Sequence, residues 1–546
     1  MQPTSHADLI FHGGLILTME PGNPRPEAVA VAGGAVLAVG SKESVFGTTR
    51  GPATRIIDLD GRALLPGFID GHGHIANLAS SLGAANLSAP PVGEVEDIKS
   101  LLETLRRFIR ERNIPPGNWV SGRGYDPAFL KEGRHPSRDD LDRVSEEHPI
   151  HIGHVSGHLC SANSLALAIA GIGPETAPPP GGVIRHQPGR LEPDGVLEES
   201  AMGLLTPHIP LPTDEQRLAD LEEAQRIYAA SGITTAQEGA MFPAQQQLLE
   251  RAAEEGRLFI DVAGYAFWAQ ARVMLEGRDI GKYHGRYKNA GMKLMLDGSP
   301  QGKTAWLTKP YHIVPEGQPA DYCGYPSMPD EQAAGLVDRA YANGWPVISH
   351  CNGDASADQL IAAVRAATQA HPGADRRTVM IHAQTVREDQ LDAMVELGML
   401  PSFFVSHVYY WGDFHRDSVL GPERAARISP LRSAQLRGLR FNLHNDSPVV
   451  PPDILRLVWC AVARRTRSNQ VLGAEQAISV EDALRAVTID AAYAHFEEDR
   501  KGSITPGKLA DLVVLGADPT TVPLEDIPSI EVRATLKEGA AIHGQL

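Results

Sequence analysis

Residues 63–74 read ALLPGFIDGHGH, an apolar run that ends in two histidines, His72 and His74, with one glycine between them. Seven further short apolar runs follow along the chain, at residues 232–239, 258–267, 291–298, 345–353, 379–384, 399–404 and 439–446. Runs of this length, bounded by glycine and polar residues, are typical of buried strands. The chain therefore has eight candidate strands, and the first of them ends in a pair of imidazoles.

Several of the intervening segments have helical patterns. One opens with a capping box from Thr213 to Gln216 and ends at Gly232, and another runs from Pro329 to Gly344. Eight strands alternating with helices predict an α/β fold with a parallel (β/α)8, TIM-like barrel. A doubly wound open sheet would alternate in the same way, but no GxGxxG motif follows an early strand, which favours the barrel.

The remaining segments indicate additions to the barrel. Residues 75–212 lie between the first and second runs and are too many for a loop, so we expect an inserted subdomain or lid after the first strand. The first 65 residues and the last 50 both read as short strands separated by glycine turns. We expect a small composite β-sandwich from residues 1–65 and 495–546, and the barrel over 66–494.

Composition narrows the class of partner. The 546 residues are 42% hydrophobic with a formal charge of −17, which argues against nucleic acid or an anionic membrane surface. The four cysteines are scattered, no signal-peptide pattern opens the chain, and no apolar stretch approaches 18 residues. We therefore expect a cytoplasmic protein whose partner is a small-molecule substrate. The oligomeric state stays open, a homo-oligomer included.

Histidine and aspartate side chains recur at the predicted strand ends. His72 and His74 are two residues apart, so on an extended strand both imidazoles point to the same side. His350, His382 and Asp446 each end a separate apolar run. The HxH pair alone is equally explained by two hydrogen-bonded histidines. However, further histidine and aspartate residues recur at the carboxyl ends of the predicted strands. Barrel enzymes place their catalytic groups there, so this recurrence favours a metal site.

Lys293 lies inside the apolar run 291–298, where burying an unpaired ammonium is costly. One interpretation is that it pairs with Asp297 or extends outward to solvent. The other is that the desolvated, neutral amine reacts with CO2 to give a carbamate, an anionic oxygen ligand that can bridge two metal ions.

These motifs, in this order, resemble the amidohydrolase superfamily, and more closely its YtcJ-like branch, which includes N-substituted formamide deformylases. The similarity spans nearly the whole chain, from LLPGFIDGHGHI through GMKLMLDGS, VISHCNGDASAD, IHAQ and HNDSPVVPPD to GSITPGKLADLVVLGADP. Segments NWVSGRGYDPAFL, SGHLCSANSLAL and GGVIRHQPGRLEPDGVLEE resemble the family's inserted region.

The resemblance implies one or two divalent metal ions, commonly zinc. It implies that His72, His74, His350 and His382 are metal ligands, that Lys293 is a carboxylated bridging ligand, and that Asp446 is both ligand and catalytic base. It also marks His158, in a segment resembling GHxxxxNS, as a substrate-binding residue, with Asn163 structural. His444 replaces a residue that is often glycine in the family. We expect it to contact substrate or an additional ion, or to make an ordinary hydrogen bond at the barrel mouth.

The sequence offers several other candidate site residues outside the predicted ligand set. His151 and His154 form a second histidine-rich run with His158, but we expect both to be ordinary. Glu238 is as readily a structural hydrogen-bond acceptor as a site residue. The aromatic residues Trp119, Phe267, Trp306 and Trp411 are candidates for an apolar pocket wall, although aromatic side chains in loops more often serve packing.

The function expected from this pattern is hydrolysis of a carbon–nitrogen bond other than a peptide bond, in an N-formyl, N-acyl or cyclic amide. A metal-activated water would attack the carbonyl, and Asp446 would take the water proton and deliver it to the leaving nitrogen. One alternative is an aminohydrolase that deaminates a small ring, against which Lys293 argues. The other is a metal-free scaffold, against which the filled ligand positions argue.

Overall fold

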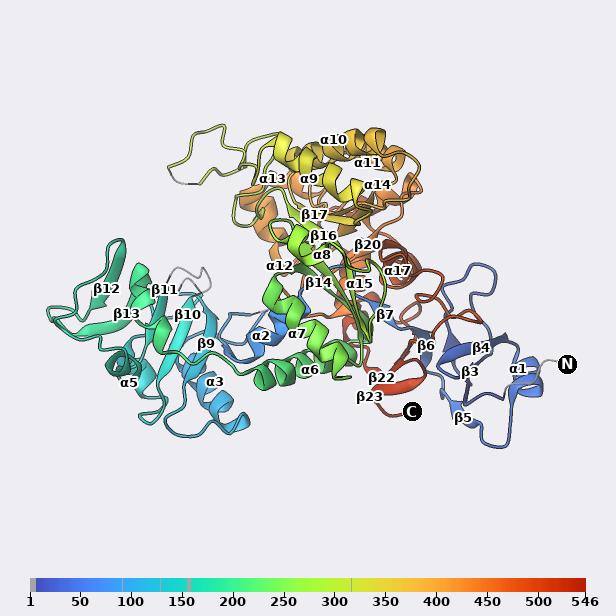
Figure 1. Ribbon diagram of the computed structural model, residues 1–546, viewed down its shortest axis with the longest axis horizontal. Coiled ribbons are helices and arrows are strands. Elements are labelled where there is room, and N and C mark those ends of the chain that lie inside the picture. Colours follow the sequence, from blue (N-terminus) through green and yellow to red (C-terminus); the bar gives the residue numbers. More distant parts are fainter. Residues whose placement is uncertain (1–5, 91, 128, 155–158, 316) are drawn as a thin grey trace. The chain divides into compact units, whose positions relative to one another are not determined.

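The computed structural model describes residues 6–90, 92–127, 129–154, 159–315 and 317–546 (Figure 1). The chain forms two compact units. The larger takes in the chain up to Leu78 and from Leu221 onward, and the smaller takes in Ala79–Asp220, most of the predicted insertion 75–212. Helices α2 (Ile75–Leu82) and α6 (Asp214–Ala230) carry the chain between them.

The larger unit is built on an eight-stranded parallel sheet whose strands are neighbours in chain order. The strands are β7 (Phe68–Ile69), β14 (Ile233–Met241), β15 (Asp261–Phe267), β16 (Tyr287–Met295), β17 (Val347–Cys351), β18 (Val379–His382), β19 (Leu400–Phe403) and β20 (Asn442–Leu443). Each falls within or overlaps one of the eight predicted runs, which confirms them. Strands such as β18 are buried along their whole length, as expected where a parallel sheet is covered on both faces.

The first and last strands of this sheet meet just beyond their carboxyl ends. The His74 amide donates to the Ser447 carbonyl at 2.8 Å, and the Asp446 amide donates to the His72 carbonyl at 3.2 Å. Gly71 allows this approach, because a methyl group there would lie 2.6 Å from the Leu443 carbonyl oxygen. The sheet therefore curls into a TIM-like barrel.

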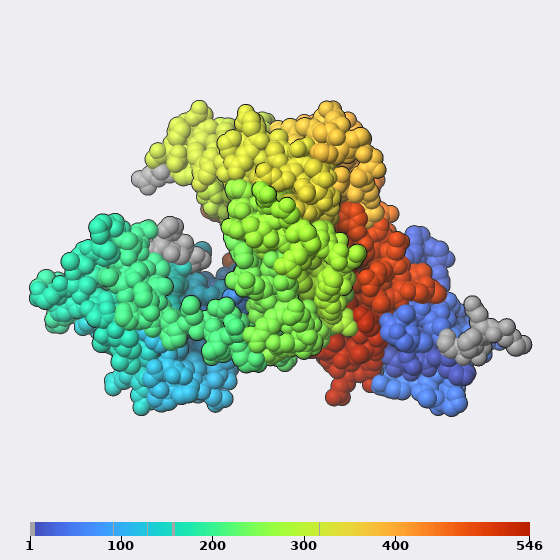
Figure 2. All heavy atoms as spheres, in the orientation of Figure 1, coloured from blue at the N-terminus to red at the C-terminus, as the bar shows by residue number. Residues whose placement is uncertain are grey.

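Helices alternate with the barrel strands along the chain. They are α7 (Pro243–Glu254), α8 (Ala271–Leu275), α9 (Asp330–Ala342), α10 (Asp354–Ala370), α11 (Glu388–Leu397), α12 (His407–Phe414), α13 (Gly421–Ala425), α14 (Leu431–Leu436), α15 (Ile454–Ala463), α16 (Val480–Ala486) and α17 (Ile489–Ala494). Figure 2 shows the green and yellow segments, which carry α7–α10 in Figure 1, at the surface of the larger unit. The predicted capping box is present, since Gln216 N donates to Thr213 Oγ1 and Thr213 N to Gln216 Oε1.

The two ends of the chain share a five-stranded sheet in the order β2-β6-β21-β22-β23. Its strands are β2 (Leu15–Ile16), β6 (Ala63–Pro66), β21 (Leu512–Leu515), β22 (Val532–Lys537) and β23 (Ala540–Gly544). A second sheet, in the order β4-β3-β1-β5, contains β1 (Leu9–His12), β3 (Ala28–Ala32), β4 (Ala35–Gly40) and β5 (Arg55–Asp58), with α1 (Lys42–Thr49) beside it. One apolar cluster, including Phe11, Leu64 and Leu536, joins the two sheets. The blue and red strands lie side by side in Figure 1.

The first predicted run is divided between two sheets. Residues 63–66 form β6 in the terminal sheet, and only Phe68–Ile69 belong to the barrel. Gly67 separates them, and a methyl group there would lie 2.5 Å from Thr234 Cγ2. The larger unit contains both the terminal sheets and the barrel. The division into a sandwich of residues 1–65 and 495–546 and a barrel of 66–494 thus stays a prediction.

The smaller unit has its own six-stranded sheet, in the order β12-β13-β11-β10-β9-β8. Its elements are β8 (Ala85–Asn86), α3 (Ile98–Glu111), β9 (Val120–Tyr125), α4 (Arg138–Asp142), β10 (Ile150–His154), β11 (Leu159–Ala162), α5 (Ser164–Ile169), β12 (Gly182–His186) and β13 (Pro193–Glu199). Helix α3 buries Leu101, Leu102 and Leu105 in a core of its own. Over the described residues of both units, no helix is long and apolar enough to cross a membrane.

Candidate metal centre

His72 and His74 leave the end of β7 with their Nε2 atoms turned to the same centre. The Nδ1 atom of His72 is hydrogen-bonded to Gln237 Oε1, and the Nδ1 atom of His74 lies 3.3 Å from Glu238 Oε1. Both partners lie on β14, the neighbouring strand. With each Nδ1 atom turned to an acceptor, each Nε2 atom is available to a metal ion.

Asp446 faces the same centre from beyond β20. Its Oδ1 atom lies 3.3 Å from His74 Nε2 and 3.6 Å from His72 Nε2, and it has no hydrogen-bond partner within the described chain. Burial raises the pKa of this carboxyl, but the neighbouring imidazoles of His74, His382 and His72 outweigh burial and hold the pKa well below its usual value. The candidate ligand atoms of His72, His74 and Asp446 all lie within 4.8 Å of one another.

Lys293 projects from β16 into this group. Its side chain is 2% exposed and its Nζ atom lies 2.9 Å from His72 Nε2. Burial lowers the pKa of the amine to about 8, so a substantial neutral fraction exists at neutral to mildly basic pH. No ion pair joins Lys293 to Asp297 among the residues that the structure describes. Asp297 instead accepts the amides of Asn352, Gly353 and Trp306.

His350 and His382 form a second pair of donors at the ends of β17 and β18. His382 Nε2 lies 2.9 Å from His350 Nδ1. The other nitrogen of His350, Nε2, lies 3.0 Å from the Gly298 carbonyl oxygen, to which it donates. Burial lowers the pKa of both imidazoles, His350 to about 4, which keeps them neutral and able to coordinate. The two facing nitrogens are within hydrogen-bond distance of each other, and with a lone pair on each they would suit a shared cation.

His444 lies behind His382 and is completely buried. Its Nε2 atom is 3.2 Å from His382 Nδ1, and its Nδ1 atom is 2.7 Å from Ser402 Oγ. Both ring nitrogens therefore have protein partners. This geometry favours the hydrogen-bonding interpretation of His444 over the substrate contact that the sequence also allowed.

The donor set fits a divalent ion. Four imidazoles, one carboxylate and one lysine come from the ends of β7, β17, β18 and β20 and from β16. Nitrogen and oxygen ligands of this kind are the ones that zinc and similar borderline ions prefer. The unpartnered Oδ1 atom of Asp446 is a buried ligand atom of this kind.

Comparison with known proteins agrees with this architecture. The model of the amidohydrolase family matches residues 55–543. The chain belongs to the amidohydrolase family. It is 27% identical to an N-substituted formamide deformylase of Arthrobacter pascens (98% of each chain) and 26% identical to a Bacillus subtilis strain 168 protein named as amidohydrolase YtcJ (98% of this chain, 99% of the relative). Its fold matches the crystal structure of an uncharacterized metal-dependent hydrolase from Pyrococcus horikoshii OT3, with 23% identity and a TM-score of 0.73 over 98% of this chain and 100% of that one.

Three of the histidines singled out from the sequence, His151, His154 and His158, belong to the smaller unit of this amidohydrolase. His158 lies outside the described residues, so its predicted role in substrate binding stays a prediction. His151 Nδ1 lies 3.2 Å from Ser121 Oγ, and His154 Nε2 lies 3.8 Å from Asp126 Oδ1. Asn163 is structural as expected: its side chain caps α5 and accepts the Ile150 amide.

Sequence reasoning missed the partners that orient the ligands in this amidohydrolase. Gln237 holds His72, and Ser402 holds His444. The open question about Glu238 has an answer too: it is completely buried, faces His74 Nδ1 and accepts the Ala76 amide. The available signal was the pair of adjacent polar residues Gln237 and Glu238 within a buried strand.

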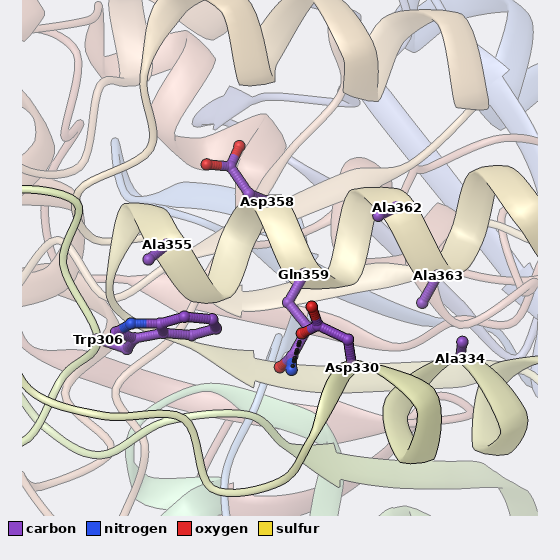
Figure 3. A pocket seen from close by; sticks show the side chains of 8 residues that line it. All are labelled: Trp306, Asp330, Ala334, Ala355, Asp358, Gln359, Ala362 and Ala363. Carbon is purple, nitrogen blue, oxygen red and sulfur yellow. Dashed lines mark hydrogen bonds between the residues drawn. The ribbon is translucent and has the colours of Figure 1, made fainter.

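A separate cavity of about 410 Å³ lies between α9 and α10. Figure 3 shows the Trp306 indole at one side, with Gln359 hydrogen-bonded to Asp330 at 2.8 Å. None of the candidate ligands of the amidohydrolase lines it. Trp306 therefore lines a pocket, as its sequence position allowed, but this pocket is apart from the metal centre.

Proposed function

We propose that this amidohydrolase is a metal-dependent enzyme that hydrolyses a carbon–nitrogen bond, other than a peptide bond, in an N-formyl, N-acyl or cyclic amide of a small molecule. The observation that carries the proposal is the convergence of His72, His74 and Asp446 within 4.8 Å, with the buried Lys293 beside them. The name of the Arthrobacter relative, a formamide deformylase, supports the amide class of substrate.

We propose that His72, His74 and Asp446 hold one divalent ion and that His350 and His382 hold a second, with zinc the ion that best suits these ligands. The neutral amine of Lys293 would form an N–C bond with CO2 and release a proton, and the resulting carbamate would bridge the two positions. A bound divalent ion supplies a water of lowered pKa and polarises the substrate carbonyl.

The proton transfers fall to Asp446. Its carboxylate is held ionised by the surrounding histidines, and its Oδ1 atom is free of hydrogen bonds within the described chain, so it is ready to accept the proton of the attacking water. Once the carbonyl carbon is tetrahedral, the same carboxyl would deliver this proton to the leaving nitrogen. The nitrogen then departs as a neutral amine and leaves a carboxylic acid.

A hydrolysis screen tests the proposal. Metal-reconstituted protein is assayed against formamides, acylamides, carbamates and cyclic amides, with Lys293→Ala as the blank. We expect turnover of at least one amide class by the wild type and none by the variant. Near-wild-type activity in metal-replete Lys293→Ala would overturn the bridging role, and release of ammonia from ring amidines alone would replace the amide proposal with deamination.

The cysteines bear on the cellular compartment. Cys160, Cys323, Cys351 and Cys460 are all free thiols. Thiols without disulfide partners fit a reducing compartment, and we propose a cytoplasmic location.

A further inference from the structure

The hydrolytic mechanism above leaves one buried imidazole of the site without a task. His444 is completely shielded from solvent, and its two ring nitrogens contact His382 Nδ1 at 3.2 Å and Ser402 Oγ at 2.7 Å. No nitrogen of His444 is left for a substrate or an ion. Its contacts therefore run outward from the ligand His382 to Ser402 on the neighbouring strand β19.

A bound ion would fix the proton positions of these histidines. With the ion between His350 Nδ1 and His382 Nε2, both atoms would present lone pairs, so the proton of His382 would be on Nδ1. That N–H would donate to His444 Nε2. His444 would then carry its own proton on Nδ1 and donate it to the Ser402 hydroxyl oxygen.

This arrangement differs from that of the other three candidate ligands. His72 donates to the amide oxygen of Gln237, His74 faces the carboxylate of Glu238, and His350 donates to the carbonyl of Gly298. Only His382, among these four, has a neutral ring nitrogen as its acceptor. Carboxylate and carbonyl partners orient a ligating histidine and raise its basicity, and an anionic acceptor does so most.

Both imidazoles are buried, so water has no access to replace His444 as the hydrogen-bond acceptor of His382. The ring of Phe404 lies beside both imidazoles, with centroid distances of 6.0 Å to His382 and 5.3 Å to His444. Phe404 is 1% exposed and His382 3%. A variant without an acceptor at residue 444 would therefore leave the Nδ1–H of His382 buried and unpaired, which costs free energy and favours a turned ring.

We propose that the Ser402–His444 pair is a positioning device that holds His382 in place for the ion. We also propose that the ion position of His350 and His382, which has no carboxylate of its own, is weaker than the position of His72, His74 and Asp446. The inference rests on the proposed metal-dependent function. It predicts an enzyme with one firmly held ion and one that exchanges readily.

The test measures bound metal, with no assay of turnover. Zinc-loaded protein is dialysed against graded chelator, and zinc per chain is determined by elemental analysis. We expect the wild type to lose zinc in two steps. In His444→Leu, the more easily removed ion should bind roughly 10–100-fold more weakly, with the other unchanged. His444→Gln, which keeps an acceptor oxygen, should recover part of that loss.

A second histidine pair provides the matched control. His415 is also completely buried, and its Nε2 atom lies 3.0 Å from His407 Nδ1, so His415→Leu removes a similar imidazole contact from outside the ligand set. We expect His415→Leu to keep the wild-type zinc curve. Three outcomes would overturn this inference but leave the proposed function standing. They are equal loss of zinc in both leucine variants, an unchanged zinc curve in His444→Leu, and loss of zinc from the wild type in a single step. A wild type that takes up no zinc would overturn the proposed function as well.

Discussion

Gly73 separates the two histidines that follow β7, and it has no room for a side chain. A methyl group there would lie 2.3 Å from Asp70 Oδ2 and 2.9 Å from Tyr228 OH, both of which are buried. We expect Gly73→Ala to shift the turn that carries His72 and His74. It should destabilise the protein by about 1–3 kcal/mol and lower bound zinc per chain.

Thermal unfolding and elemental analysis measure the two effects of Gly73→Ala. Gly335→Ala is the control, because a methyl group at this position of α9 meets nothing within 4 Å and alanine favours a helix. If Gly73→Ala keeps the stability and the metal content of the wild type, the expected clash of the added methyl group with Asp70 and Tyr228 is contradicted.

Asp446 is the second residue whose role is open to direct measurement. Asp446→Asn keeps the size of the side chain but removes the proton acceptor and weakens the ligand. We expect kcat to fall at least about 10²–10⁴-fold. Asp453→Asn is the matched control, since Asp453 caps α15 beyond the same strand and asparagine caps equally well. Activity of Asp446→Asn within a few-fold of wild type would transfer the base role to another group.

At the scale of elements, the eight barrel strands were predictable because each is a short apolar run between polar turns. The length of the first was not, because the run 63–74 continues through Gly67 without a break in hydrophobicity. Two strands of different sheets, β6 and β7, share it. Only the pairing of Leu64 and Leu65 with β21 reveals where one ends.

The candidate ligands of the site could be picked out for a similar reason, since they are polar residues at or near the ends of apolar strands. Their orienting partners were not, because a partner is chosen by which strands are neighbours. Gln237 meets His72 across β14 and β7, and Ser402 meets His444 across β19 and β20. The structure was also needed to show that Asp297 accepts backbone amides and forms no ion pair with Lys293 within the described residues. The role of Lys293 as a bridging ligand stays a prediction.

At the scale of the whole molecule, a buried group of charges links the terminal sheet to the barrel. Asp261 is the first residue of β15. Its Oδ2 atom contacts the Nζ atom of Lys537 in β22 at 2.6 Å and that of Lys501 at 2.5 Å. Lys501 and Lys288 also pair with Glu497, and Lys537 with Asp511. Three lysines thus face three carboxylates, so the group is balanced in charge. Breaking such a pair is costly because the remaining charge stays buried.

This group makes acid stability sensitive to Asp261. Burial raises the pKa of Asp261, but Lys501 and Lys537 outweigh burial and lower the pKa to about 2. The unfolded-state value is about 3.9. The carboxylate therefore stabilises the fold fully above about pH 4, and this contribution is lost as the pH falls through about 2. It amounts to roughly 3 kcal/mol.

Urea unfolding at pH 5, 4, 3 and 2 measures this contribution. We expect the free energy of unfolding to fall steeply below pH 4 in the wild type and less steeply in Asp261→Asn. Asp417→Asn, at an exposed carboxylate, should keep the wild-type slope. Equal slopes in wild type and Asp261→Asn would remove Asp261 from the account of acid stability.

The metal content of the purified wild-type protein tests the central claim most directly. Protein expressed with added zinc is dialysed, and zinc per chain is counted by elemental analysis before and after chelation. The account predicts at least one ion per chain, together with amide hydrolysis that chelation abolishes and zinc restores. Bound zinc near zero, with the fold intact, would contradict it and favour a metal-free scaffold.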